Sequence, residues 1–417
     1  MTAGRAPGAD EAAEGRFWPS GHQLSCFLAA WAGWVLDAFD FTVYLLALSH
    51  VARDFGASLT AVSSVVTATL VFRVLGGLVA GSAADRWGRR PVLLLSIVAM
   101  ALCDGAIAFA PSLAWVFVLR VLFGFAMGAE WTAGATLAME NWPARSRGLA
   151  SGLLQGSWGI GYLLAALVSR WALPLWGWRG LFLLAAAPAL LVLPLRYLVK
   201  EEEGAFRART APPWGALLRP PYLHRLAWTA AVLALGFAAY YGLVSSYPTL
   251  LGRELGLDAA AIAGVVVWFN LGMLAGAPLN GIVFARWGAR AALAAPALVT
   301  IALLPLYLGR VPGMLGAGAF LVGAVAAGTS GCTPLLLARL FPAPLRGRAS
   351  GLAYHLGALL AAPAPAVVAA LAERMPAMTL AGAMAAVAAA AELSLAALLL
   401  LVPLPEGARP LVRARAG

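Results

Sequence analysis

Charged side chains are scarce in this sequence. They make up 11% of its 417 residues, whereas 62% of the residues are hydrophobic and the mean hydropathy is +0.84. A soluble domain carries about 25% charged residues, so this composition excludes a soluble globular protein. The apolar residues form long runs without the alternation that is typical of barrel strands, which excludes a membrane β-barrel. We therefore expect an all-α integral membrane protein.

Cysteine is also rare. The three cysteines, Cys26, Cys103 and Cys332, lie in apolar runs and have neither a pairing pattern nor a metal-ligand spacing. We interpret them as small buried apolar side chains. The sequence also lacks a nucleophile–base arrangement, so we expect no enzymatic activity and neither a metal nor another cofactor.

The apolar runs predict twelve membrane spans, because about 20 residues of apolar helix cross a hydrocarbon core. The predicted spans are 24–50, 59–83, 91–110, 113–139, 147–171, 179–198, 226–250, 259–284, 291–309, 313–337, 347–371 and 378–402. The corresponding organisation is a cytoplasmic N-terminal segment (1–22), a six-helix bundle (23–198), a cytoplasmic linker (199–225), a second six-helix bundle (226–402) and a cytoplasmic tail (403–417).

The net charge of +11 is unevenly distributed. If the N-terminus is cytoplasmic, most of the 29 Lys and Arg residues fall in segments on the cytoplasmic side. Basic residues are enriched in cytoplasmic loops of membrane proteins. We therefore expect a multi-pass protein of the inner (plasma) membrane with both termini in the cytoplasm. The positive charge reflects this topology, and we expect no nucleic-acid partner.

An internal repeat divides the chain into two halves. Asp85-Arg-Trp-Gly-Arg-Arg90 recurs as Ala285-Arg-Trp-Gly-Ala-Arg290, and Trp142-Pro-Ala-Arg-Ser-Arg-Gly-Leu-Ala-Ser-Gly-Leu153 recurs as Phe341-Pro-Ala-Pro-Leu-Arg-Gly-Arg-Ala-Ser-Gly-Leu352. Both matches have nearly the same offset. We infer two six-helix halves of the same orientation, an arrangement found in transporters that bind their substrate near the membrane midplane between the halves.

The loop after the second predicted span has the features of a cytoplasmic gate. Gly88 permits a tight turn, and the neighbouring arginines anchor the loop at the cytoplasmic surface. Asp85 is placed to pair with a basic residue of a neighbouring helix end or to cap that helix, although the loop can also be an anchoring turn alone. Ala285 replaces the acid in the second half, so such a latch is one-sided. The gate residues that we predict are Gly81, Asp85, Arg86, Gly88, Arg89, Arg90 and Arg147.

Several of these motifs resemble known families. Gly81–Arg90 resembles the loop signature of the major facilitator superfamily, and Arg120–Gly124 resembles its fourth-helix motif. The resemblance implies twelve transmembrane helices in two pseudo-symmetric six-helix bundles. Trp34–Phe41, Gly124–Trp131 and Arg147–Gly156 are similar to segments of the sialate:proton symporter family, which implies proton-coupled transport of a carboxylate.

The second half departs from one branch of that family. Its lactate transporters carry a His and a Gln-Asp pair just before the Tyr-Pro of the seventh helix. The segment Tyr240–Pro248 lacks these residues, which argues against lactate as the substrate and leaves carboxylates in general open.

The first predicted span contains two acids, Asp37 and Asp40. An ionisable residue within a span costs about 2.5–3.5 kcal/mol on insertion scales and indicates a function. The two acids are three residues apart and share one helix face, where burial and mutual repulsion oppose the ionisation of both. We predict that they couple transport to protons, with Glu130 as a further proton site. The alternatives are permanent pairing of an acid with Arg73 or Arg120, and a helix-packing hydrogen bond for Glu130.

Arg73 and Arg120 are the two arginines within spans. Arg73 lies about 18 Å from the gate loop, near the midplane, and offers a planar set of donors to a carboxylate. Its expected partners are the first-span acids or a substrate carboxylate. The resemblance to the superfamily motif suggests that Arg120 could pair with Asp37 or Asp40. The predicted substrate-binding residues are Arg73, Arg120, Gln155, Tyr162, Tyr241, Ser245 and Asn270.

These observations favour a secondary active transporter that carries a small organic anion, similar to a monocarboxylate, by proton symport. The proton gradient would be its energy source, and its partners would be the substrate, protons and the lipid bilayer. The alternative is a proton-driven efflux antiporter for drugs or metabolites, which the absence of a Gly-Pro element in Gly156–Gly161 disfavours. A transporter-like sensor that moves nothing is disfavoured by the retained charges within the spans. We expect a monomer.

Overall fold

The computed structural model describes residues 16–197, 213–375 and 377–410, which are helical throughout apart from short connections. Ten stretches of these residues are long and apolar enough to cross a membrane. Two of them, Ala144–Pro194 and Ala260–Tyr307, each contain two passes, because a glycine with non-helical torsion angles interrupts the helix at Gly177 and at Gly288. Twelve passes result, as the hydropathy pattern predicts.

The first bundle contains six passes. Gly177 turns the chain between the last two of them. The helices are α2 (Gly21–Asp54), α3 (Leu59–Trp87), α4 (Arg89–Ile107), α5 (Leu113–Asn141) and α6 (Arg147–Tyr197).

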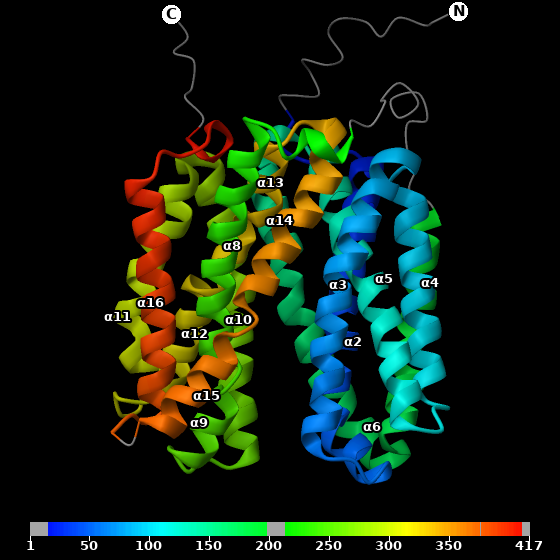
Figure 1. Ribbon diagram of the computed structural model, residues 1–417, viewed down its shortest axis with the longest axis vertical. Coiled ribbons are helices and arrows are strands. Elements are labelled where there is room, and N and C mark those ends of the chain that lie inside the picture. The colour runs from blue at the N-terminus through cyan, green and yellow to red at the C-terminus, as the bar shows by residue number, and fades with distance from the viewer. Residues whose placement is uncertain (1–15, 198–212, 376, 411–417) are drawn as a thin grey trace, which may run out of the picture.

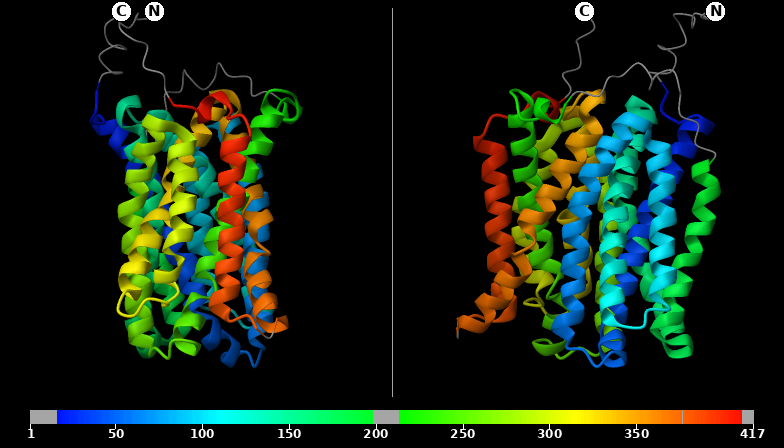
Figure 2. Two further views of the ribbon diagram at one scale, coloured as in Figure 1. Left: turned by 90° about the vertical axis from the view of Figure 1, so that its left-hand side faces the viewer. Right: turned by 45° about the vertical axis from the view of Figure 1, so that its right-hand side comes forward.

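The second bundle is built from more, shorter segments. Its helices are α8 (Tyr222–Val244), α9 (Tyr247–Arg253), α10 (Ala259–Ala289), α11 (Ala295–Tyr307), α12 (Leu315–Val325), α13 (Thr333–Leu340), α14 (Arg346–Ala361), α15 (Ala364–Arg374) and α16 (Leu380–Leu401). Short 3₁₀ or π turns include η1 (Ala144–Ser146), η2 (Trp214–Ala216), η3 (Arg290–Ala294), η4 (Ala327–Cys332), η5 (Ala343–Leu345) and η6 (Glu406–Ala408). Figures 1 and 2 show the two bundles side by side with their helices running along one axis.

The predicted ends and linker fall partly outside the described residues, which exclude 1–15, 198–212 and 411–417. Within the predicted linker, 199–225, the described part contains η2 and the first turn of α8. The second bundle therefore begins at Tyr222, slightly before the predicted residue 226.

The sequence repeat corresponds to a repeated backbone. Gly88 has φ 102° and ψ 165°, and Gly288 has φ 74° and ψ −171°. A positive φ favours glycine over any residue with a side chain, so both turns require it. The second repeat behaves in the same way, because η1 precedes α6 and η5 precedes α14.

Two equivalent contacts join the bundles. Helix α14 packs against α3, and α6 packs against α10. A Cβ added to Gly81 would lie 2.8 Å from the carbonyl oxygen of Gly347, and a Cβ added to Gly148 would collide with the backbone of Gly281. Small residues allow helices to approach this closely, and the glycines of α6 and α14 derive from the same repeated motif.

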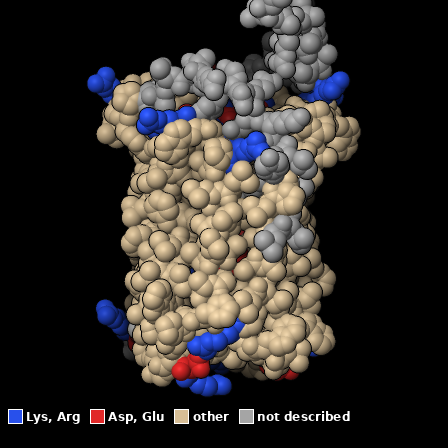
Figure 3. Space-filling view, turned by 90° about the vertical axis from the view of Figure 1, so that its right-hand side faces the viewer, with Lys and Arg blue, Asp and Glu red and all other residues tan. Residues whose placement is uncertain are grey.

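The charged side chains mark the two ends of the molecule. On the face shown in Figure 3, uncharged residues cover most of the middle, whereas Lys, Arg, Asp and Glu gather near both ends. This distribution is the one expected of a bundle whose middle faces lipid.

Candidate functional site

Asp85 joins the two bundles at the gate loop. Its Oδ1 accepts a hydrogen bond from the backbone N–H of Gly347 at 3.2 Å, and its Oδ2 accepts one from that of Arg348 at 3.1 Å. The same carboxylate pairs with Arg89 at 3.2 Å. The buried Asp85 thus caps α14 of the other bundle and also pairs with an arginine of its own bundle. Its position in the sequence suggested both contacts.

Glu140 is a second link at this end that the sequence reading missed. Its Oε1 lies 3.0 Å from Nη1 of Arg346 in the other bundle and 3.3 Å from Nη2 of Arg89. Its place at the end of the fourth predicted span, next to the gate side, was the signal available in the sequence. The carboxylates of Asp85 and Glu140 thus form a network of arginines and acids across the interface.

Two further predicted gate residues, Arg147 and Arg86, have contacts within their own bundle. Arg147 donates from Nη2 and Nε to the carbonyl oxygen of Trp142 at 2.9 and 3.2 Å, within its own bundle. Arg86 is exposed beside the ring of Trp87, and Arg90 is half-buried. Arg147 thus stabilises the connection between α5 and α6, whereas Arg86 lies in the gate loop itself.

The bundles are joined on the gate side and separate toward the other end. Deeper in, Ser151 of α6 donates to the carbonyl oxygen of Gly331 at 2.6 Å and accepts from the N–H of Leu335 at 3.1 Å. At the opposite end the ribbons of α2 and α9 stand apart (Figure 1). This conformation is closed at the gate loop.

Arg73 of α3 is buried between the bundles, with 7% of its surface exposed. Its guanidinium carbon lies 5.5 Å from the ring centre of Trp34, 6.0 Å from that of Trp158 and 5.7 Å from that of Tyr354. In the described part of the chain its Nε and Nη2 have no hydrogen-bond acceptor and the side chain forms no ion pair. The expected pairing with a first-span acid is therefore not observed, because aromatic rings occupy the positions around this cation.

Tyr354 connects this aromatic cage to the second bundle. Trp131 stacks on Tyr354 with 3.5 Å between ring centres, and its Nε1 donates to Oε1 of Gln155 at 3.1 Å. His355, the next residue, lies 3.4 Å from Oγ1 of Thr132. Predicted residue Gln155 thus lies beside the cage, whereas the sequence reading missed Tyr354 and Trp131.

Tyr241 also belongs to these surroundings. It stacks on Phe237, which lies edge-on to Tyr354 at 5.2 Å, and it lies within electrostatic range of Arg73. The structure thus brings predicted residues Arg73, Gln155 and Tyr241 together.

The remaining predicted lining residues divide into two groups. Tyr162 is half-buried near Tyr240, and Asn270 is buried and donates to a backbone carbonyl of its own helix at 2.9 Å. Ser245 is exposed at the end of α8, where its hydroxyl donates to the carbonyl oxygen of Tyr241 at 2.7 Å. No described contact links Ser245 to Arg73.

Arg120 pairs with an acid other than the two expected. Its Nη1 lies 3.5 Å from Oδ1 of Asp104 on the neighbouring helix α4, and both side chains are buried. Among the described residues no ion pair joins Arg120 to Asp37 or Asp40, because the packing of α4 against α5 places Asp104 beside the guanidinium. Asp40 lies within electrostatic range of Asp37, Asp104 and Arg120, so three acids and one arginine share a buried region.

Glu130 lies between α4 and α5. It is 2% exposed, and its Oε2 accepts a hydrogen bond from the hydroxyl of Ser96 at 2.7 Å. The helix-packing hydrogen bond, weighed as an alternative for this residue, is therefore present.

Two six-helix bundles of the same orientation, joined at one end above a buried arginine, are an arrangement typical of membrane transporters. The sequence profile of the Major Facilitator Superfamily matches residues 30–353. The chain belongs to this superfamily and is a multi-pass secondary transporter, not an enzyme.

Similar sequences and a similar solved structure support this assignment. The sialic acid transporter NanX of Escherichia coli (strain K12) is 27% identical, over 81% of this chain and 84% of its own. A probable 4-methylmuconolactone transporter of Cupriavidus pinatubonensis (strain JMP 134 / LMG 1197) is 31% identical over 81% of each chain. The structure of the proton:xylose symporter XylE bound to 6-bromo-6-deoxy-D-glucose superposes with a TM-score of 0.73 at 18% identity, over 94% of this chain and 98% of that one, which supports the fold.

Proposed function

We propose that this transporter carries a small organic anion, a carboxylate, together with protons. The observation that carries the proposal is Arg73, a buried cation between the bundles with two nitrogens that lack an acceptor in the described part of the chain. An unpaired buried charge is costly. A substrate carboxylate offers a planar pair of acceptors that matches the guanidinium, and it would supply the missing anion.

The aromatic cage supports this assignment. Trp34 and Trp158 come from the first bundle and Tyr354 from the second. An anion bound to Arg73 would contact both bundles, so its binding would depend on how they are placed relative to one another. A ligand shifts a conformational equilibrium only by such a difference in affinity.

The acids provide a basis for proton coupling. If Asp37, Asp40 and Asp104 were all ionised, Arg120 would neutralise only one of three charges in a buried region. Low dielectric and like charges oppose this state, so we expect at least one carboxyl to hold a proton. Trp34 and Asp37 lie three residues apart on α2, on one face, which connects the proton site to the cage.

The orientation in the membrane determines which side the open end of this conformation faces. We propose that the arginine-rich gate loop and both termini are cytoplasmic in an inner (plasma) membrane, in accord with the bias of basic residues. The closed end is then cytoplasmic, and this conformation would receive substrate from outside. The relative named for sialic acid supports an organic anion. We expect the transporter to act as a monomer.

Uptake into proteoliposomes tests the proposal. We expect a labelled carboxylate from a panel of such acids to accumulate when the inside is alkaline, and Asp37→Asn or Asp40→Asn to abolish this accumulation while sparing exchange. Accumulation that ignores the pH gradient would exclude proton coupling. Extrusion of amphipathic compounds without carboxylate uptake would favour the antiporter, and normal accumulation by both variants would make the acids structural.

A further inference from the structure

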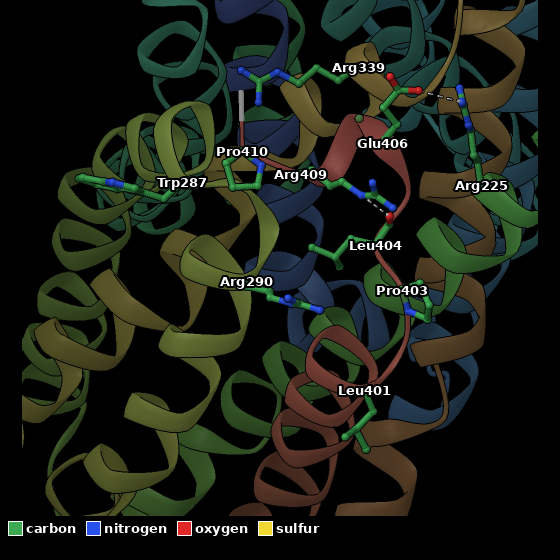
Figure 4. Close-up of a pocket in the computed structure, with 11 residues that line it drawn as sticks. Arg225, Trp287, Arg290, Arg339, Leu401, Pro403, Leu404, Glu406, Arg409 and Pro410 are labelled. Carbon is green, nitrogen blue, oxygen red and sulfur yellow. Dashed lines mark hydrogen bonds and ion pairs between the residues drawn. The ribbon is translucent and has the colours of Figure 1, made fainter. Parts of the chain in front are cut away.

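A second cationic cavity lies at the gate-loop end of the second bundle. It has a volume of about 1080 Å³, is open to solvent on one side, and is bordered by the ends of α8, α10, α13 and α16 together with η3 and η6 (Figure 4). Four arginines line it: Arg225, Arg290, Arg339 and Arg409. None of them contacts the aromatic cage around Arg73, so this cavity is separate from the proposed transport site.

The cavity has a surplus of positive charge. The acid that lines it, Glu406, is 4.0 Å from Arg225 and mostly exposed to solvent, so it neutralises little. Nη1 of Arg339 is buried and has no acceptor within the described residues. Arg290 and Arg409 are exposed, and Nε of each donates to a backbone carbonyl at 3.0 Å, which orients the guanidinium without neutralising it. Across the described ranges, neither Arg290 nor Arg409 forms an ion pair. The cavity therefore offers several cationic donors to an anion.

The edge of the cavity is apolar and exposed. Leu401, at the end of α16, is 82% exposed, and Trp287, which precedes the turn at Gly288 in α10, is 55% exposed. Both lie where membrane-spanning helices end, and tryptophan is typical of the interface between lipid and water. A soluble anion gains nothing from such an edge, whereas a lipid would place its phosphate among the arginines and its chains beside Leu401.

We propose that this cavity binds the headgroup of an anionic phospholipid from the leaflet on the gate side. The surplus of arginines fits a headgroup with two phosphates, as in cardiolipin, better than one with a single phosphate, because basic pockets between helix ends bind such headgroups. A lipid bound there would contact α10, α16 and η6 at the same time. The inference does not depend on the transported substrate.

Native mass spectrometry of the full chain in detergent tests the proposal. Cardiolipin, phosphatidylethanolamine and inorganic phosphate are added separately. We expect cardiolipin to bind at least about tenfold more tightly than phosphatidylethanolamine. Arg290→Gln and Arg409→Gln should each weaken cardiolipin binding about fivefold, which is the effect of about 1 kcal/mol per arginine near an anionic lipid surface. The matched control is Arg286→Gln. Arg286 is exposed and lies about one turn before Arg290, but it does not line the cavity.

Several results would overturn the proposal. They are equal binding of the two lipids, unchanged cardiolipin binding in both cavity variants, or an equal loss in the control. Displacement of cardiolipin by millimolar inorganic phosphate would instead identify a site for soluble anions. Circular dichroism of each variant excludes misfolding as the cause of a loss, and a variant that fails this check is replaced by the other.

Discussion

At the scale of single residues, Arg73 shows what the sequence predicts and what it does not. Its charge follows from the residue type, and its depth in the membrane follows from counting residues from the gate loop. Its neighbour Tyr354 does not, because contacts between the bundles leave no local pattern. The repeat held a usable signal all the same, since an offset of 199 relates Gln155, which was predicted, to Tyr354, and the two lie on either side of Trp131.

Arg120 shows a different limit. Its partner Asp104 was visible in the sequence as an acid within the third predicted span. Periodicity assigns residues to faces of one helix, but it does not say which neighbouring helix those faces meet. The choice between Asp104 and the two first-span acids therefore needed the packing of α4 against α5.

Replacement of Arg73 tests the anion site. We expect Arg73→Gln to weaken carboxylate binding by at least about tenfold, because a hydrogen bond to a charged group contributes about 1.5–3 kcal/mol. Arg73→Lys should retain part of the affinity, since it keeps the charge and loses the planar pair of donors. The measurement is isothermal titration of the purified protein with the transported carboxylate.

Arg170→Gln is the control for this comparison, because Arg170 is exposed on α6 and its loss should leave binding unchanged. Equal affinities of Arg73→Gln and the unaltered protein would show that the buried guanidinium does not bind the substrate.

At the scale of helices, the beginning of α14 determines how the bundles close. The equivalent helix start of α6 faces Ala285 of α10, where no carboxylate is present, so the acidic cap is one-sided as the sequence indicated. The sequence did not reveal Glu140 as a second link, because its partner Arg346 comes from the other half of the chain. Motif spacing describes each half well and describes their contact poorly.

Asp85→Asn should open the gate end. The substitution removes the charge that interacts with the N-terminus of α14 and with Arg89, a loss of about 1 kcal/mol, so the population open at the gate should rise roughly fivefold. The measurement is the distribution of distances between spin labels placed at Trp87 and Trp287, which are exposed on different bundles at this end.

Asp258→Asn provides the matched control. Asp258 also caps a helix, since it accepts from the N–H of Ala261 at 2.8 Å, but it does so within one bundle. An identical shift of the distances in both variants, or no shift in Asp85→Asn, would show that Asp85 stabilises its helix without holding the bundles together.

At the scale of the whole molecule, composition and repeat were enough for the architecture. The long apolar runs predicted twelve spans, and the recurrence of Asp85–Arg90 as Ala285–Arg290 predicted two equivalent halves, both of which the fold confirms. The sequence does not predict which end of the molecule is closed, because the same residues would form a molecule closed at either end. The sequence also did not predict the cationic cavity at the gate-loop end of the second bundle, since its arginines come from four separate segments.

The sign of proton movement tests the account most directly. Proteoliposomes enclose a pH-sensitive dye and start with equal pH on both sides, and the transported carboxylate is added outside. We predict that its entry acidifies the interior beyond the change in protein-free liposomes, and that Asp40→Asn removes this difference. An interior that becomes alkaline as the substrate enters, or carboxylate entry without any proton movement, would contradict proton-coupled symport.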